Sequence, residues 1–147
     1  MKHYIRLAVM TALMFVAMYV LMYAMVDQLE NVFPNVNQFY MAGLMTAPMV
    51  VIELAMMRAM YEKRSANIAI ILVSLLAFVG FWIGVREQVA VSDDQFLKSM
   101  IPHHAGAVLM CENAQLQDEE IKSLCQNILS SQTSEIAQMK KIVDRMQ

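Results

Sequence analysis

The sequence contains little glycine, proline or charge, and these shortages limit the folds that it can adopt. Its 147 residues include only four glycines and three prolines, which favours long helices over a turn-rich β fold. Only 16% of the residues are charged and 59% are hydrophobic, against about 25% and 45–50% in soluble domains. The net charge is −2 and the basic residues are dispersed, which disfavours a nucleic-acid partner. We therefore expect an all-α membrane protein that binds no nucleic acid.

The sequence also lacks the short motifs that mark common enzyme classes. It has no Walker, dinucleotide-binding or G-x-S-x-G motif, and no C-x-x-C or H-E-x-x-H pair. The E-x-x-H pairs of ferritin-like di-iron sites are missing as well, which makes an oxidoreductase of that type a weak hypothesis. We predict that the protein is not an enzyme.

Three apolar runs are long enough to cross a bilayer, which requires about 20 residues of helix. They are Leu7–Val26, Phe39–Met57 and Ile68–Val85, and they predict spans at about 5–26, 39–60 and 67–86. A cleaved signal peptide is the alternative for the first run, but the run is long and no A-x-A-like site follows it. We predict a retained span and a transmembrane domain over residues 1–88.

The basic residues predict the orientation of these spans. Lys2 and Arg6 flank the first run, the first loop has no Lys or Arg, and the second loop has three, Arg58, Lys63 and Arg64. The positive-inside rule then places the N-terminus in the cytoplasm and residues 89–147 on the other side. In a bacterium, the membrane would be the inner membrane, and residues 89–147 would lie in the periplasm.

Residues 89–147 predict a helical hairpin. Ser92 and Gln95 have the spacing of a capping box at the start of the first arm, and Pro102 predicts a kink within it. The second arm is expected to start at Asp118. Its apolar seam is predicted at Ile121, Cys125, Ile128, Gln132, Glu135, Met139, Ile142 and Met146. So small a hairpin buries too little surface to be stable alone, which predicts a homo-oligomer with a four-helix bundle.

Side chains that can bind a metal ion gather in the first arm. Met100 shares a helix face with His103 and with His104, so a thioether and an imidazole can reach one ion. The two histidines diverge by about 100° around a helix and do not chelate one ion together without help. Thioether and imidazole ligands favour copper as Cu(I). The alternative is that the histidines form hydrogen bonds within a bundle.

The segments D-x-F-L-K-S-M-I-P-H-H-A-G-A-V-x-M and I-L-S-S-Q-x-S-E-I-A-Q-M, within Asp94–Met139, resemble the family named domain of unknown function 305. The methionine-rich membrane half is similar to a subgroup of that family. The resemblance implies a ferritin-like helical bundle, and some soluble periplasmic members are associated with copper binding. Longer members carry two hairpins where this chain offers one, which again implies assembly between chains. The matching positions are Met100, His103, His104, Gln132, Glu135 and Met139.

Cys111 and Cys125 lie on opposite arms of the predicted hairpin. Folding about residues 116–117 leaves them offset by about three residues, or ~4.5 Å, near the limit for a disulfide. A disulfide, free buried thiols and metal ligation remain alternatives.

The predicted spans contain two further features. Methionines form one stripe in each of the first two spans, at 10, 14, 18, 22 and 25, and at 41, 45, 49, 56 and 60. Adaptable packing is the simpler interpretation and a thioether ladder for metal ions the alternative. Glu53 is an acid deep in a span, with either a structural or a functional role, and Arg6 is its candidate partner.

Together these features predict an integral membrane protein of the bacterial inner membrane whose periplasmic domain binds copper-like ions in metal homeostasis or resistance. Met100, His103 and His104 are the predicted core ligands, with Glu135 and Met139 as contributors from the second arm. The alternative hypothesis is a membrane-anchored scaffold or oligomerisation module that binds no metal.

Overall fold

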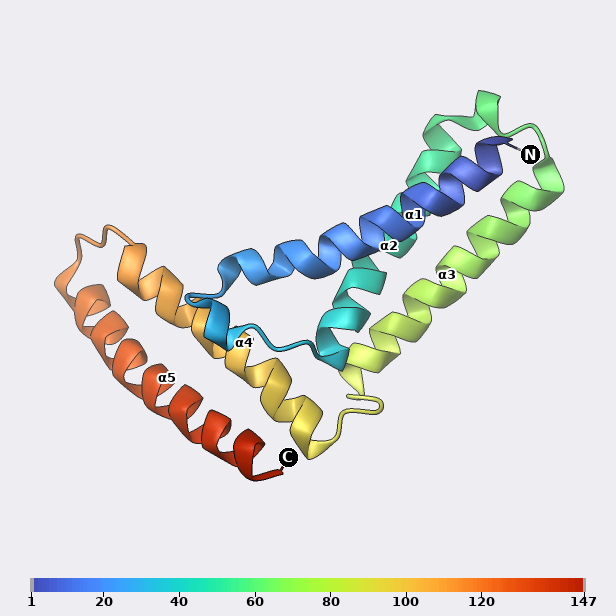
Figure 1. Cartoon of the computed structure of the whole chain (residues 1–147). Helices are drawn as coiled ribbons and strands as arrows, with labels where there is room; N and C mark the ends of the chain where they lie inside the picture. The colour runs from blue at the N-terminus through green and yellow to red at the C-terminus, as the bar shows by residue number, and fades with distance from the viewer. Residues whose placement is uncertain (1, 147) are drawn as a thin grey trace. The chain divides into compact units, whose positions relative to one another are not determined.

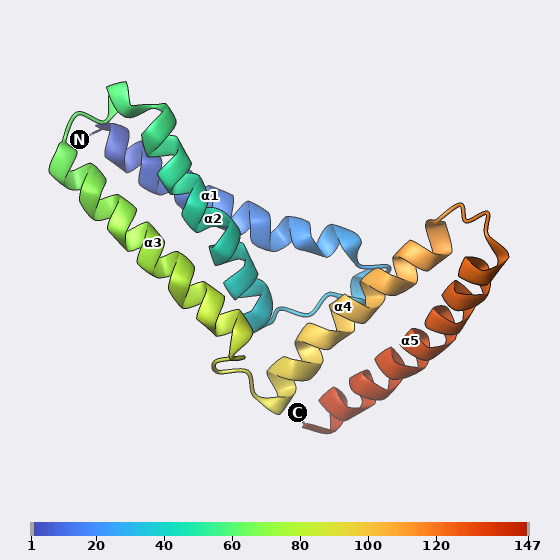
Figure 2. The same cartoon turned by 180° about the vertical axis from the view of Figure 1, so that it is seen from behind.

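The computed structural model describes residues 2–146, and within this range the chain is entirely helical (Figures 1 and 2). This range contains five α-helices, and short 3-10 helices lie in the first two connections between them. The order is α1 (Lys2–Leu21), η1 (Met22–Met25), η2 (Leu29–Asn31), α2 (Val36–Met56), η3 (Arg58–Met60), α3 (Arg64–Arg86), α4 (Asp93–Asn113) and α5 (Glu119–Met146). The expected all-α fold, with long apolar helices followed by C-terminal helices, is confirmed.

Three helical segments are long and apolar enough to cross a membrane. They are Lys2–Met25, Val36–Met56 and Arg64–Arg86, and they match the predicted spans to within a few residues at most ends. Large apolar side chains on them point outward, such as Leu13, which is 66% exposed, and Leu76, which is 72% exposed. In water such exposure would be unfavourable, whereas hydrocarbon chains solvate these side chains in a bilayer.

The chain forms two compact units, and the second is discontinuous in sequence. The first unit contains α1, α2 and α3, and it extends to Ala90. The second contains Tyr23–Val36 together with the hairpin of α4 and α5. The loop between the first two spans therefore packs with the C-terminal hairpin. A single boundary near residue 88 would instead assign this loop to the transmembrane domain.

Polar contacts hold this loop against α4. Ser92 caps α4 and accepts a hydrogen bond from the Gln95 backbone N–H, at 3.4 Å, as the sequence predicts. The Gln95 side chain does not complete a capping box, because its Oε1 accepts from the backbone N–H of Val36, at 2.9 Å. The reciprocal half of the predicted capping box is therefore replaced by a contact with the loop.

Pro102 lies inside α4, which continues through it to Asn113. A proline cannot donate the hydrogen bond that the carbonyl four residues earlier, here that of Lys98, would otherwise accept. The Asn35 side chain supplies a replacement, since its Nδ2 donates to the Lys98 carbonyl at 3.3 Å and to Phe33 at 2.9 Å. Asn35 is only 6% exposed, so the loop compensates for the proline from a buried position.

The hairpin core lies between α4 and α5, which run antiparallel and side by side in both views (Figures 1 and 2). Its fully buried members are Ile101, Ala105, Val108, Ile136 and Val143. Val26 and Phe33 from the loop pack against this cluster, so the loop contributes to the core as well as to the polar contacts.

The predicted seam of α5 is wrong in part. The buried side chains include Ile136 and Val143, with Leu129 and Met139 packed against the same core. Ile121 and Met146, two predicted seam positions, are 49% and 46% exposed. The true stripe is offset by one residue at three positions and runs through Cys125, Leu129, Gln132, Ile136, Met139 and Val143.

The end of the hairpin is fixed by a helix cap and a disulfide. Asp118 Oδ1 accepts hydrogen bonds from the backbone N–H groups of Glu120 and Ile121, at 2.9 and 3.1 Å, so it caps α5, which begins one residue after the expected start. Cys111 and Cys125 form a disulfide with their Cα atoms 5.5 Å apart. Of the three alternatives for these cysteines, the structure has the disulfide.

Candidate functional site

The histidine motif lies on α4 opposite the middle of α5, and His104 connects the two arms. The His104 side chain is 11% exposed, and its neighbour Ala105 is fully buried in the hairpin core. Its Nδ1 lies 2.9 Å from the backbone carbonyl oxygen of Met100, and its Nε2 lies 2.8 Å from Oε2 of Glu135. Both ring nitrogens are therefore engaged.

The hydrogen-bond partners of His104 determine which of its ring nitrogens carries a proton. A carbonyl oxygen can only accept, so Nδ1 carries a proton and donates it to Met100. In a neutral ring Nε2 then bears a lone pair, and it faces a carboxylate that also can only accept when ionised. Two acceptors at 2.8 Å need a proton between them. A metal ion bound to both atoms, at about 2.0–2.2 Å from each, replaces this proton only if the two side chains move apart.

The position of Glu135 explains its access to His104. Glu135 precedes Ile136, which is buried in the core, so it stands at the edge of the α4–α5 interface. Its side chain is 49% exposed, and its carboxylate reaches back to His104. Because Glu135 lies outside the apolar stripe and is half exposed, solutes can reach its carboxylate.

The other predicted ligands are arranged less closely. His103 is exposed, and its ring centroid lies 6.1 Å from that of His104, at an interplanar angle of 63°. Met100 contacts His104 through its backbone carbonyl, and its side chain is half-buried. Met139 packs against the apolar core. Of the five predicted ligands, the structure records a side-chain hydrogen bond only between His104 and Glu135.

Within residues 2–146, no three His, Cys, Asp or Glu side chains cluster closely enough to hold a metal ion. Cys111 and Cys125 are excluded as thiolate ligands while they form a disulfide. Any ion at His104 and Glu135 would need a further donor, from a thioether, from His103 or from a second chain.

Glu53 has a different partner from the one expected. Its Oε1 accepts a hydrogen bond from the hydroxyl of Tyr61, at 3.3 Å, where the sequence suggested Arg6. Burial, followed by the charge and hydrogen bond of Glu53, raises the pKa of Tyr61. The Tyr61 carbonyl in turn accepts from Asn67 Nδ2 at 2.7 Å, and Asn67 Oδ1 accepts from Tyr4 at 2.9 Å.

Sequence reasoning missed Asn35, Gln95 and Tyr61 as structural partners. Asn35 and Gln95 act across 63 and 59 residues of chain, and nothing in their local pattern indicates such a contact. Pro102 is the only available signal, because it leaves a carbonyl that needs another donor.

Comparison with known proteins gives a family match over most of the hairpin. The family described as "Domain of unknown function (DUF305)" matches residues 85–143, a range that includes α4 and all five predicted ligands. "Uncharacterized protein L153" of Acanthamoeba polyphaga mimivirus is 31% identical over 112 residues, which cover 75% of this chain and 72% of that protein. No solved structure matches the chain. On the match of the family model over residues 85–143, the chain belongs to the DUF305 family.

Proposed function

We propose that the hairpin domain binds a soft, copper-like metal ion, with His104 as the central ligand and Glu135 beside it. The protein would act in metal homeostasis or resistance, as an integral membrane protein that presents this domain outside the cytoplasm. In a bacterium the compartment would be the periplasm. The disulfide between Cys111 and Cys125 supports an oxidising compartment for the hairpin.

The arrangement around His104 is the observation that carries the proposal. Histidine ligands of metal ions donate the other ring N–H to a carbonyl or carboxylate, which fixes the tautomer and the ring orientation. His104 has this arrangement, since Nδ1 donates to Met100 while Nε2 points toward Glu135. The backbone of α4 thus holds the ring ready to offer Nε2 to an ion.

The donor set fits copper if the thioethers take part. One imidazole and one carboxylate suit several ions, including Zn²⁺ and Cu²⁺, whereas thioethers select Cu(I). Met100 and His103 lie within one turn of His104 on α4 and supply the nearest additional donors in the chain. Met139 would join only if it left the core. A homo-oligomer would provide the same donors from a second chain.

A copper titration of the full-length protein in detergent tests the proposal. Cu(I) is titrated in competition with a chromogenic chelator under anaerobic conditions, and Zn²⁺ is titrated in parallel. We expect stoichiometric binding that collapses in His103→Ala/His104→Ala. His3→Ala is the matched control, because it removes the third histidine, in α1, and should leave binding unchanged. Equal Cu(I) affinity in the double variant and the wild type would contradict the proposal.

The second candidate function is a scaffold or oligomerisation module without metal. It is supported by the two cross-links between α4 and α5, the disulfide and the His104–Glu135 pair, in which a proton would take the place of the ion. Apolar side chains on the hairpin are also available to a partner, since Phe96 is 50% and Leu124 is 56% exposed. This function predicts oligomers that are insensitive to chelators and to the histidine substitutions.

A further inference from the structure

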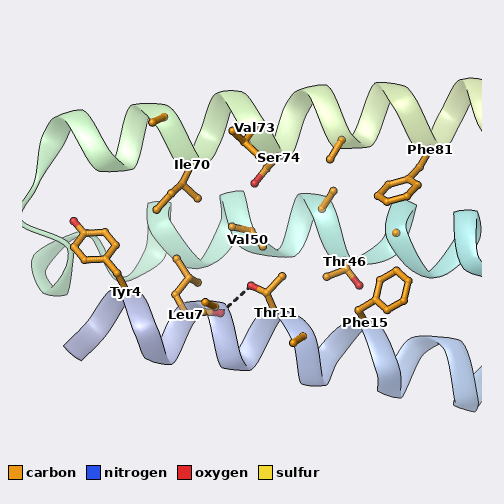
Figure 3. Close-up of a pocket in the computed structure, with 16 residues that line it drawn as sticks. Tyr4, Leu7, Thr11, Phe15, Thr46, Val50, Ile70, Val73, Ser74 and Phe81 are labelled. Carbon is orange, nitrogen blue, oxygen red and sulfur yellow. Dashed lines mark hydrogen bonds between the residues drawn. The ribbon is translucent and has the colours of Figure 1, made fainter. Parts of the chain in front are cut away.

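A cavity of about 630 Å³, open along one side, lies between α1, α2 and α3 in the first unit, and Val73 in its wall is 65% exposed (Figure 3). Its volume is within the range of about 300–1,000 Å³ that is usual for ligand pockets. All three helices line it, almost wholly with apolar groups. No hairpin residue lines this cavity, so its occupant does not depend on the metal site.

Small side chains create this space. Ala8 and Ala12 face it from α1, Gly43 and Ala47 from α2, and Ala77 from α3. In each of the first two pairs the residues are four apart, so they lie on one helix face. In a membrane-spanning unit, small residues normally allow helices to approach closely. Gly43 does this, because a Cβ there would overlap the Phe81 ring. The alanines leave an apolar space that a lipophilic occupant can fill favourably.

Thr46 provides a polar group at this cavity. It is 4% exposed, and its Oγ1 has no hydrogen-bond partner among residues 2–146. A buried hydroxyl without a hydrogen-bond partner costs free energy, and in the bilayer core no water is available to supply the partner. Threonine uses two χ1 rotamers in helices, and rotation between them can exchange its hydroxyl and methyl groups at the cavity wall. Thr46 can therefore present a hydrogen-bond donor to an occupant.

The depth of Thr46 restricts what this occupant can be. Thr46 is the eleventh residue of the 21 in α2, about 15 Å from either end, and so near the bilayer midplane. A bilayer phospholipid keeps its ester oxygens at the interface, far from this hydroxyl. Figure 3 shows Phe15 and Phe81 at the same end of the cavity as Thr46, where their rings form an aromatic wall that a flat molecule can contact.

We propose that this cavity binds a neutral membrane quinone or a chemically similar lipid. Its apolar tail would fill the space between Leu7, Val50 and Ile70, which line the other end. Its ring would lie near Phe15 and Phe81, and a carbonyl oxygen would accept the hydrogen bond of Thr46. The shared chemistry is a long apolar chain joined to an uncharged oxygen acceptor at the membrane midplane.

Retention of a defined probe by the full-length protein tests this inference. The protein in detergent is incubated with decylubiquinone or, in a parallel arm, with dioleoyl phosphatidylcholine, and the compound that co-elutes in size-exclusion chromatography is quantified. We expect about one quinone per chain and no stoichiometric phospholipid. Thr46→Val, which removes only the hydroxyl, should weaken quinone binding by roughly three- to tenfold.

Cavity-filling variants separate specific binding from partition into the micelle. Ala77→Phe should abolish retention, whereas Ala17→Phe, on an exposed part of α1 outside the cavity, should retain the probe. Equal retention in both variants, or selective retention of phospholipid, would overturn the proposal. So would a fall in oligomeric mass with unchanged retention in Ala77→Phe, which would mean that a helix of a second copy fills the cavity. If Ala77→Phe does not fold, Thr46→Val still decides, because unchanged affinity contradicts the proposal.

Discussion

His104 is the residue on which the proposed chemistry depends, because its two nitrogens have different roles. The Met100 carbonyl fixes the proton on Nδ1, and this leaves Nε2 as the only ring atom available to an ion. The acidic partner at 2.8 Å stabilises a proton on Nε2 in this structure. A metal site would use the same two side chains with the proton displaced and the two atoms farther apart.

Glu135→Gln separates these two possibilities. A glutamine amide can donate to the Nε2 lone pair, so the link between the arms survives while an anionic ligand is lost. We expect Cu(I) affinity to fall by at least about tenfold, with a change in unfolding free energy below about 1 kcal/mol. Chelator competition and thermal unfolding measure the two effects. A variant that binds copper normally would remove Glu135 from the site.

Tyr61 should make the stability of the protein depend on pH in the alkaline range. Burial and Glu53 raise its pKa above the usual 10.0, so the folded state holds this proton more tightly than the unfolded state. The resulting stabilisation is complete below about pH 10 and is lost as the pH rises through the raised pKa. Tyrosinate absorbance near 295 nm should show a phase from Tyr61 that ionises above the usual range, and Tyr61→Phe should remove that phase. An unchanged titration curve in Tyr61→Phe would contradict the assignment.

The elements show where sequence patterns are sufficient and where they are not. The spans and the caps at Ser92 and Asp118 follow from local signals, such as apolar length and side-chain oxygens beside free N–H groups. The register of α5 does not, because a 3–4 spacing can be drawn through Ile128 and Glu135 or through Leu129 and Ile136. Only packing against α4 distinguishes them, and it places the charged Glu135 at the edge.

The disulfide makes a testable contribution to the hairpin. It joins residues 14 apart in sequence, and closing a loop of that size in the unfolded chain is worth about 3 kcal/mol. We expect Cys111→Ser/Cys125→Ser to lower hairpin stability by about that amount, measured as faster amide exchange in α4 and α5. Reductant should have the same effect on the wild type and none on the double variant. Equal exchange in the two proteins without reductant would contradict this account.

At the scale of the whole molecule, the chain forms two units, and the hairpin unit includes a segment that lies between the first two spans in sequence. Residues 23–36 follow the first span but belong to the hairpin unit. Sequence patterns predict the spans and the hairpin separately, because each depends on nearby residues. They do not predict that Asn35 would replace the hydrogen bond lost at Pro102, since that contact joins residues 63 apart.

The contribution of this segment predicts the behaviour of an isolated hairpin. Residues 89–147 alone lack Val26 and Phe33, which pack on the core, and Asn35, which binds the Lys98 carbonyl. We expect the fragment to show a lower melting temperature and weaker amide protection around Pro102 than the same segment in the full chain. Adding Cys111→Ser/Cys125→Ser should unfold it further. Equal protection in the fragment and the full chain would show that the loop does not stabilise the hairpin.

X-ray absorption at the copper edge of the Cu(I)-loaded full-length protein tests the central claim most directly, because it reports the atoms bound to the ion. We predict an imidazole nitrogen and at least one thioether sulfur around copper in the wild type, with the imidazole signal from His104 lost in His104→Ala and kept in His3→Ala. A wild-type spectrum without imidazole, or one that His104→Ala leaves unchanged, would contradict the account.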